Sequence, residues 1–249
     1  MSLTRGLQTL ETKKEQKEGK AMTDIAEKEI ILNHKFYPID LDHWDRRQYF
    51  YYFTKMLPTG YSISVEVDIT NTYIAIKNQN RRFFPAYIYL ASKLIAEQQE
   101  FRIANLEGQL GYYEILHPSY ACFHQDDKTM SNMWTEYHSK FEMFYCNYME
   151  DQEKYADKHG ILAKPDMPPH NSYMIGMLPW IEFTSYTPIP YANAEYYFPI
   201  IQAGRFFERE GKKFMPLSIT VHHAVADGYH VGLFLEKFKT GMAHPEKWM

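Results

Sequence analysis

Cysteine is scarce in this chain of 249 residues, which contains only Cys122 and Cys146 and no CxxC motif. This scarcity argues against a disulfide framework and a structural zinc site, and it is typical of a reducing cytoplasm. An uninterrupted apolar run of 18 or more residues is also absent, so the sequence predicts no membrane-spanning helix. Residues 1–20 carry charges where a signal peptide needs an apolar stretch. We therefore expect a cytoplasmic protein.

Basic blocks are absent outside the N-terminal region, and the formal net charge is −4. The chain thus lacks the positive surface that a nucleic-acid backbone requires. Aromatic side chains are abundant, with 21 Tyr, 16 Phe and 4 Trp. Most of them are expected to fill the core, and some to line pockets or subunit interfaces. The length suits one large globular domain better than two small ones.

Two regions differ in composition. Residues 11–29 are dominated by Lys and Glu, which favours a solvated helix or a mobile tail. From Phe36 onward the sequence becomes a dense mixture of aromatic and β-branched residues, with no later linker and no internal repeat. We predict a charged N-terminal extension over residues 1–34, without a chemical role, and one domain over residues 35–249.

Hydrophobic periodicity and turn residues predict interspersed helices and strands. The predicted helices cover residues 42–56 with Asp42 as cap, 84–98, 137–158, and 227 or 228 to just before 241. The predicted strands cover residues 61–69, 109–114, 120–125, 172–178, 182–186, 198–207 and 214–222. This order favours an α/β (α+β) two-layer sandwich, in which helices cover one large mixed β-sheet.

Two adjacent histidines end an apolar, β-branched run in ITVHHAVADGYHVGLF, residues 219–234. Neighbouring strand residues point to opposite faces, so His222 and His223 diverge, and one imidazole can project into a pocket. Asp227 and Gly228 predict a tight turn with Asp227 as helix N-cap. A buried structural pair and a general base are comparably compatible with the residues. Metal binding by His222, His223 and Asp227 fits less well, because the histidines diverge and no further ligand-rich cluster is evident.

HHAVADG matches the HHxxxDG signature of the chloramphenicol acetyltransferases, which is shared loosely with dihydrolipoamide acyltransferases and peptide-synthetase condensation domains. The chain also resembles the first family in IDLDHWDRRQYF, FPAYIYLASKL, FRIANLEGQLGYYEILHPSYACFHQDDKTMSNMWTEY, LPWIEFTSY and MPLSITVHHAVADGYHVGLF. The resemblance covers about residues 36–240 in the family's order and spacing. It implies an acetyl-CoA-dependent O-acetyltransferase, either a chloramphenicol acetyltransferase or a close relative.

The resemblance also implies a catalytic set. His223 corresponds to the general base that takes the proton of an acceptor hydroxyl, and the oxygen then attacks the thioester carbonyl of acetyl-CoA directly. Asp227 and Arg46 correspond to a structural ion pair. No metal takes part. The family assembles as a homotrimer whose active sites lie between subunits, with the histidine of one subunit facing an acceptor pocket on its neighbour.

Residues for the two substrates follow from the same resemblance. The acceptor pocket is expected to include the apolar and aromatic side chains Tyr52, Phe53, Leu57 and Tyr186. On the coenzyme A side, the family's basic and aromatic residues correspond to Arg205 and Phe206.

The chain departs from the family on the oxyanion side. Gly176 stands where the family has a serine that donates to the oxyanion, and Met174 replaces an asparagine. Gln202 replaces a threonine that holds a water, and Ala226 replaces a cysteine. Loss of an oxyanion donor typically costs about 10²–10³ in rate. Two alternatives therefore stay open: an acyltransferase for another small alcohol, and a catalytically weakened homologue that binds coenzyme A or a small molecule.

Overall fold

One mixed β-sheet forms the frame of the part of the chain that the computed structural model describes, residues 35–189 and 195–249. Its strand order is β2-β10-β8-β7-β5-β6, with β9 beside β10. β7 runs parallel to β5 and to β8, and the other neighbours are antiparallel. The strands are β2 (Gly60–Asp68), β5 (His117–Phe123), β6 (Met130–Trp134), β7 (Ser172–Leu178), β8 (Ile200–Gly204), β9 (Phe207–Arg209) and β10 (Lys212–His222).

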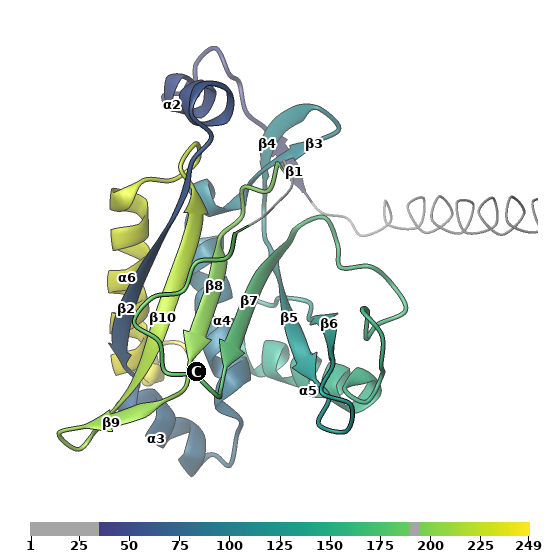
Figure 1. The fold of residues 1–249 in the computed structure, drawn as a ribbon, viewed down its shortest axis with the longest axis vertical. Coiled ribbons are helices and arrows are strands. Elements are labelled where there is room, and N and C mark those ends of the chain that lie inside the picture. The colour runs from purple at the N-terminus through teal and green to yellow at the C-terminus, as the bar shows by residue number, and fades with distance from the viewer. Residues whose placement is uncertain (1–34, 190–194) are drawn as a thin grey trace, which may run out of the picture. The chain divides into compact units, whose positions relative to one another are not determined.

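A second, antiparallel sheet has three strands, in the order β1 (Phe36–Pro38), β4 (Gln109–Tyr113) and β3 (Ile103–Leu106). The helical segments are α2 (Arg47–Tyr51), η1 (Tyr52–Met56), α3 (Thr70–Asn78), α4 (Phe83–Ala96), η2 (Gln99–Arg102), α5 (Phe141–Tyr155), α6 (Gly228–Ala243) and η3 (Pro245–Lys247). The main helices gather on one face of the large sheet (Figure 1). The predicted two-layer fold class is thus confirmed.

The core lies between the sheet and these helices. Met215, Leu217 and Ile219 of β10 are completely buried, and Ser218 between them is buried as well, so both faces of the strand are covered at its centre. Helix α4 is apolar almost all round, and eleven of its fourteen residues are buried. Such a helix has no solvent face and belongs at the centre of the helical layer.

The opposite face of the sheet is crossed by irregular chain after β7. Tyr186 donates its backbone N–H to Ser64 Oγ at 3.3 Å, and its carbonyl accepts from Ser218 Oγ at 2.7 Å. These bonds to side chains replace ladder hydrogen bonds, so the strand predicted over residues 182–186 was wrong. No helix of the described residues is long and apolar enough to cross a membrane.

Several observed helix and strand boundaries also differ from the predicted ones. The helix expected from Asp42 begins at Arg47, because Asp42 accepts a hydrogen bond from the Arg47 guanidinium instead of capping. The predicted helix over residues 137–158 is the shorter α5, and the strand over 198–207 is divided into β8 and β9. α3, β1, β3 and β6 had no counterpart among the predictions. The predicted extension, residues 1–34, lies outside the described residues.

Candidate active site

His223 lies just beyond the end of β10, where its backbone N–H donates to the carbonyl of Thr59 at 2.8 Å. Its imidazole stacks on the Phe53 ring, with centroids 4.0 Å apart and planes within 9°. The Tyr61 ring meets it edge-on at 5.0 Å. Two aromatic contacts at different angles restrict rotation of the imidazole, so His223 presents a defined edge.

The two ring nitrogens of His223 differ in access. Nδ1 is buried and has no hydrogen-bond partner among the described residues, so Nε2 is the nitrogen that a substrate can reach. His222 is held differently, since its Nδ1 accepts from the backbone N–H of Ala224 at 3.1 Å and its ring contacts Tyr197. Burial, followed by the neighbouring His223, lowers the pKa of His222. The divergence predicted for the pair is confirmed, and His223 is the better placed to accept a proton.

Asp227 organises the start of α6. As predicted, it is the N-cap, and its Oδ1 accepts from the backbone N–H of Tyr229 at 3.1 Å. Oδ1 also lies 2.8 Å from Nδ1 of His230, while Oδ2 accepts from Arg46 Nη1 at 2.9 Å. Burial alone would raise the pKa of Asp227, but the Arg46 hydrogen bond and the nearby His230 and Arg46 charges hold it down at about 2. The carboxylate therefore stays ionised and ties α6 to the segment before α2.

Tyr61 is a residue of this cluster that the sequence did not single out. Its hydroxyl is buried without a partner among the described residues. Burial, then the Asp227 charge, raises the pKa of the phenol to about 12. Tyr61 thus stays protonated beside the imidazole. The sequence indicated only that Tyr61 begins the alternating strand predicted over residues 61–69, shortly after Leu57 of the predicted acceptor pocket.

The predicted acceptor residues near His223 are all on or beside η1. Phe53 contacts the imidazole directly, and the Tyr52 ring meets Phe53 edge-on at 5.0 Å. Tyr52 and Leu57 are exposed large apolar side chains. η1 is a π-helical turn, a rare backbone form that is frequent at functional sites.

Gly176, Gln202 and Tyr186 form a separate group at the middle of the sheet. Gly176 pairs with Gln202 across β7 and β8, and Gln202 pairs with Ser218 of β10. Tyr186 joins them through its hydrogen bond with Ser218. Since His223 follows Ser218 by five residues, the two groups are about 17 Å apart along β10 at 3.3 Å per residue. Within one chain, the Gly176 and Gln202 group thus lies well away from His223.

The Gln202 side chain fills the space that Gly176 leaves. An ideal Cβ on Gly176 would lie 2.8 Å from Gln202 Oε1 and 3.3 Å from Nε2. The amide donates through Nε2 to the carbonyl of Ala203 at 3.2 Å. The two departures from the family pattern are therefore one coupled change, in which a large polar side chain lies where a side chain at 176 would be.

The predicted coenzyme A residues lie beyond the end of β8. Arg205 is exposed, and its backbone N–H donates to Ile181 at 2.8 Å. Phe206 packs edge-on against Phe83 with centroids 4.9 Å apart. The Arg205 guanidinium has no hydrogen bond or ion pair with other described residues and can meet an anionic group in solvent.

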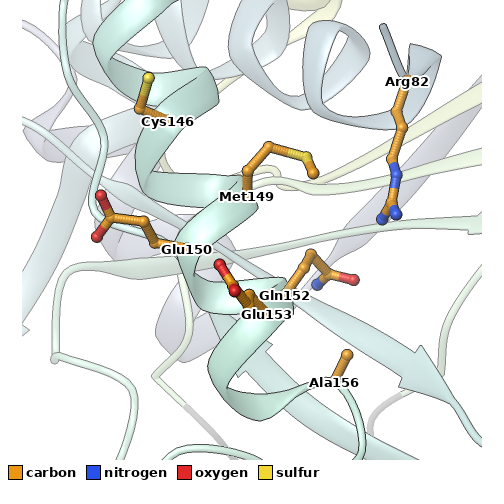
Figure 2. Close-up of a pocket in the computed structure, with 7 residues that line it drawn as sticks. All are labelled: Arg82, Cys146, Met149, Glu150, Gln152, Glu153 and Ala156. Atoms are coloured by element: carbon orange, nitrogen blue, oxygen red, sulfur yellow. The ribbon is translucent and has the colours of Figure 1, made fainter.

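A pocket of about 500 Å³ lies elsewhere, along α5 (Figure 2). Arg82 and residues of α5 line it, including Cys146, Glu150 and Glu153. None of the predicted site residues lines this pocket, so we assign it no part in the chemistry.

Comparison with known proteins gives the family. The model of the chloramphenicol acetyltransferase family matches residues 34–239. The chain belongs to the chloramphenicol acetyltransferase family. It is therefore an acyltransferase enzyme, and the resemblance that the HHxxxDG motif indicated is confirmed.

Curated relatives match over most of their length. A chloramphenicol acetyltransferase of Staphylococcus aureus is 39% identical over 203 residues, which are 81% of this chain and 96% of the relative. One of Clostridium butyricum is 34% identical over 212 residues, 85% of this chain and 96% of the relative.

Solved structures share the fold. A chloramphenicol acetyltransferase superposes with a TM-score of 0.75 at 22% identity, covering 84% of this chain and all of the other. A dihydrolipoamide acetyltransferase of Azotobacter vinelandii superposes with a TM-score of 0.59 at 19% identity, covering 74% of this chain and 82% of the other.

Proposed function

We propose that the enzyme transfers the acetyl group of acetyl-CoA to a hydroxyl of chloramphenicol or of a similar ring-bearing alcohol, with His223 as general base. The observation that carries this proposal is the setting of His223: a restrained imidazole with a buried Nδ1 and a reachable Nε2. A neutral imidazole in a fixed orientation is suited to accept a hydroxyl proton near neutral pH.

In the proposed reaction, Nε2 takes the proton as the acceptor oxygen attacks the thioester carbonyl. A new C–O bond forms, the tetrahedral intermediate collapses, and the C–S bond breaks. The proton on His223 then passes to the coenzyme A thiolate. The chemistry needs no acyl-enzyme and no metal. Asp227 and Arg46 act on it through the position of the turn after His223.

The acceptor is expected to lie against the exposed aromatic and apolar side chains of η1. Tyr52, Phe53 and Leu57 offer an apolar wall beside the imidazole, which favours an acceptor with a ring. On the coenzyme A side, the exposed Arg205 guanidinium suits a phosphate. Acetyl-CoA as donor follows from membership in the family.

We further propose that a neighbouring copy completes the active site, in the homotrimer that the family resemblance implies. The separation of about 17 Å along β10 supports this, because the Gly176 and Gln202 group cannot serve the His223 of its own chain at that distance. Exposed Met174 in β7, and exposed Trp180 and Ile181 just after it, add apolar side chains of the kind that subunit interfaces cover. Such an assembly would work in the cytoplasm, where acetyl-CoA is available.

An acceptor other than chloramphenicol is the second candidate, and the coupled change at Gly176 and Gln202 favours it. The amide lies where the family serine has a smaller hydroxyl, so both the shape and the donor of the oxyanion side differ. A catalytically weakened homologue is less favoured, because a binding protein needs neither a restrained base nor the Arg46–Asp227 pair.

Thiol release from acetyl-CoA, followed with a chromogenic reagent, tests the function directly. Chloramphenicol and a panel of ring-bearing alcohols serve as acceptors, and acetylated product is identified by mass. Acceptor-dependent thiol release that His223→Ala abolishes supports the proposal. Absence of release with every acceptor, in a preparation that binds coenzyme A, would leave the binding-protein alternative in its place.

A further inference from the structure

A second cluster of histidines and carboxylates lies away from the site described above. His124 follows β5 at the hairpin that leads to β6, together with Asp126 and Asp127, and His159 follows α5. One ligand atom each from His124, Asp126 and His159 lies within 4.8 Å of the others. In the sheet, this hairpin lies at the end opposite α2 (Figure 1). The cluster is thus separate from the general base.

Backbone contacts bring the two histidines together. The backbone N–H of Asn132 in β6 donates to Ile161 at 2.7 Å, and that of Ala163 donates back to Asn132 at 2.9 Å. The segment that contains His159 therefore runs along the edge of β6. The His159 ring lies 4.1 Å from the ring of His124, with 20° between the planes.

Hydrogen bonds settle which nitrogen of His124 carries a lone pair. Ser131 Oγ donates its single proton to the carbonyl of Lys158 at 2.7 Å. It must therefore accept from Nε2–H of His124, which is 2.7 Å away. In the neutral ring of the buried His124, Nδ1 is therefore the nitrogen with the lone pair, and a ligating histidine commonly donates its other N–H in this way.

His159 is oriented by a carboxylate. Its Nδ1 lies 2.8 Å from Asp127 Oδ2, and a carboxylate only accepts, so Nδ1 donates. The other oxygen of Asp127 is held by the backbone N–H and hydroxyl of Thr129. Nε2 of His159 lies 3.2 Å from Asp126 Oδ2. In the neutral imidazole these are two facing acceptors, and only a proton or a metal ion between them makes the contact favourable.

From this arrangement we propose that His124, Asp126 and His159 form a zinc-type metal site, with Asp127 as the carboxylate that orients His159. Two imidazoles and one carboxylate are typical ligands of zinc and of neighbouring transition metals, and water completes the tetrahedron. A metal lies in the plane of each imidazole that binds it, whereas the two rings are stacked. The more exposed ring, that of His159, therefore turns about its Nδ1 hydrogen bond to Asp127 on binding, and the buried His124 stays. The ion would cross-link the β5–β6 hairpin to the chain after α5.

The spacing of these residues in the sequence does not predict a metal site. His124 and His159 are far apart in the chain and meet only because the segment after α5 pairs with the edge of β6. The ion has no part in acetyl transfer.

The test is a calorimetric titration of the full-length chain with ZnCl₂ at pH 7.5 in chelator-free buffer. We expect one zinc per chain that is lost in His159→Gln and in Asp126→Asn. Asp126 is largely exposed, so its variant is expected to fold normally, which the melting temperature without metal checks. Asp127→Asn should weaken zinc binding about 10–100-fold. The matched control is His43→Gln, which removes an exposed histidine that also pairs with a carboxylate, Asp40.

Thermal unfolding gives an independent readout. At zinc concentrations about 100-fold above Kd, the melting temperature should rise by about 5–10 °C in wild type and in His43→Gln, but not in His159→Gln or Asp126→Asn. Acetyl transfer should be the same with and without zinc. Equal zinc affinity in wild type, His159→Gln and Asp126→Asn would overturn the proposal. So would an absence of stoichiometric binding in wild type, which would mean that a proton on His159 alone fills the gap to Asp126.

Discussion

Restoring the family serine at position 176 tests whether the oxyanion side limits turnover of chloramphenicol. We expect wild type to acetylate chloramphenicol slowly and Gly176→Ser to be faster, because a hydroxyl there donates to charge that develops only in the transition state. The structure adds a cost. The new Cβ would lie 2.8 Å from Gln202 Oε1, closer than real contacts allow, so the amide must move.

The cost is modest because the obstructing atom ends a flexible side chain. The amide gives up a hydrogen bond of 3.2 Å to Ala203 and takes another rotamer, for about 1–3 kcal/mol as in other overpacked sites. A donor to the oxyanion is worth about 10²–10³ in kcat. We therefore expect a partial gain in Gly176→Ser and a larger gain, approaching that factor, in the double variant Gly176→Ser/Gln202→Thr, where the obstruction is removed.

Steady-state kinetics with chloramphenicol and acetyl-CoA measure the effect. The matched control is Gly176→Ala/Gln202→Thr, which adds the same Cβ without a hydroxyl and should show no gain in kcat. If wild type already reaches a kcat/KM upwards of about 10⁶ M⁻¹s⁻¹, the reasoning is refuted. Gln202→Ala should then collapse the rate, since the amide would have taken over the donor role.

The remaining predictions concern the cluster around the base. His223→Ala should lower kcat by about 10²–10⁴ or more with every acceptor while coenzyme A binding persists, whereas His222→Ala should act mainly on the melting temperature. Asp227→Asn keeps a good N-cap but leaves the Arg46 charge without its partner. Because the Asp227 side chain is 37% exposed, we expect the free energy of unfolding to fall by about 1.5–3 kcal/mol, less than the roughly 3–5 kcal/mol typical of a fully buried pair. Asp227→Ala also removes the N-cap and should lose about 1 kcal/mol more. Activity lost in Asp227→Asn at an unchanged melting temperature would instead indicate a direct role in orienting His223. The pKa of Asp227 is about 2 in the folded chain, below its usual 3.8, so its stabilisation is complete above about pH 4 and is lost as pH falls through 2. The difference in melting temperature between wild type and Asp227→Asn should therefore shrink over that window, and a constant difference would contradict the assignment. Tyr61→Phe should change the pH profile of kcat/KM if its hydroxyl acts on His223, and only the stability if it does not.

Elements with strong local signals were predictable from the sequence. β7 was predicted with its observed bounds, and β2 and β10 within two residues, because a run of apolar or alternating residues marks each of them. α3 was missed, because TNTYIAIKN is rich in β-branched residues that disfavour helices. Tertiary contacts stabilise this helix instead. The hydroxyl of Thr72 donates to the carbonyl of Met242 at 2.6 Å, which holds α3 against the end of α6.

Some residues of the candidate site could likewise be predicted from the sequence, and others could not. The motif and the family resemblance named His223, Asp227 and Arg46, and the ion pair across 181 positions is present as expected. Neither the motif nor the resemblance could identify Tyr61, because its place in the cluster depends on which side chain packs beside the His223 imidazole in the folded chain. The same limit hid the fit of Gln202 over Gly176, which follows from register between β7 and β8.

The register of β10 also carries the argument for assembly. Ser218 lies in β10 and His223 in the turn that follows it, so the strand rise separates the Gly176 and Gln202 group from the base by roughly 17 Å, more than a change of rotamer covers. A thioester bound near Gln202 would therefore lie far from the His223 of its own chain. We therefore propose that the His223 of a second copy meets the Gly176 and Gln202 group, since this requires no change within either sheet. Dilution below the dissociation constant of the oligomer should then abolish thiol release while the melting of each chain remains cooperative. Specific activity that stays constant in a preparation shown by light scattering to be monomeric would refute the shared site.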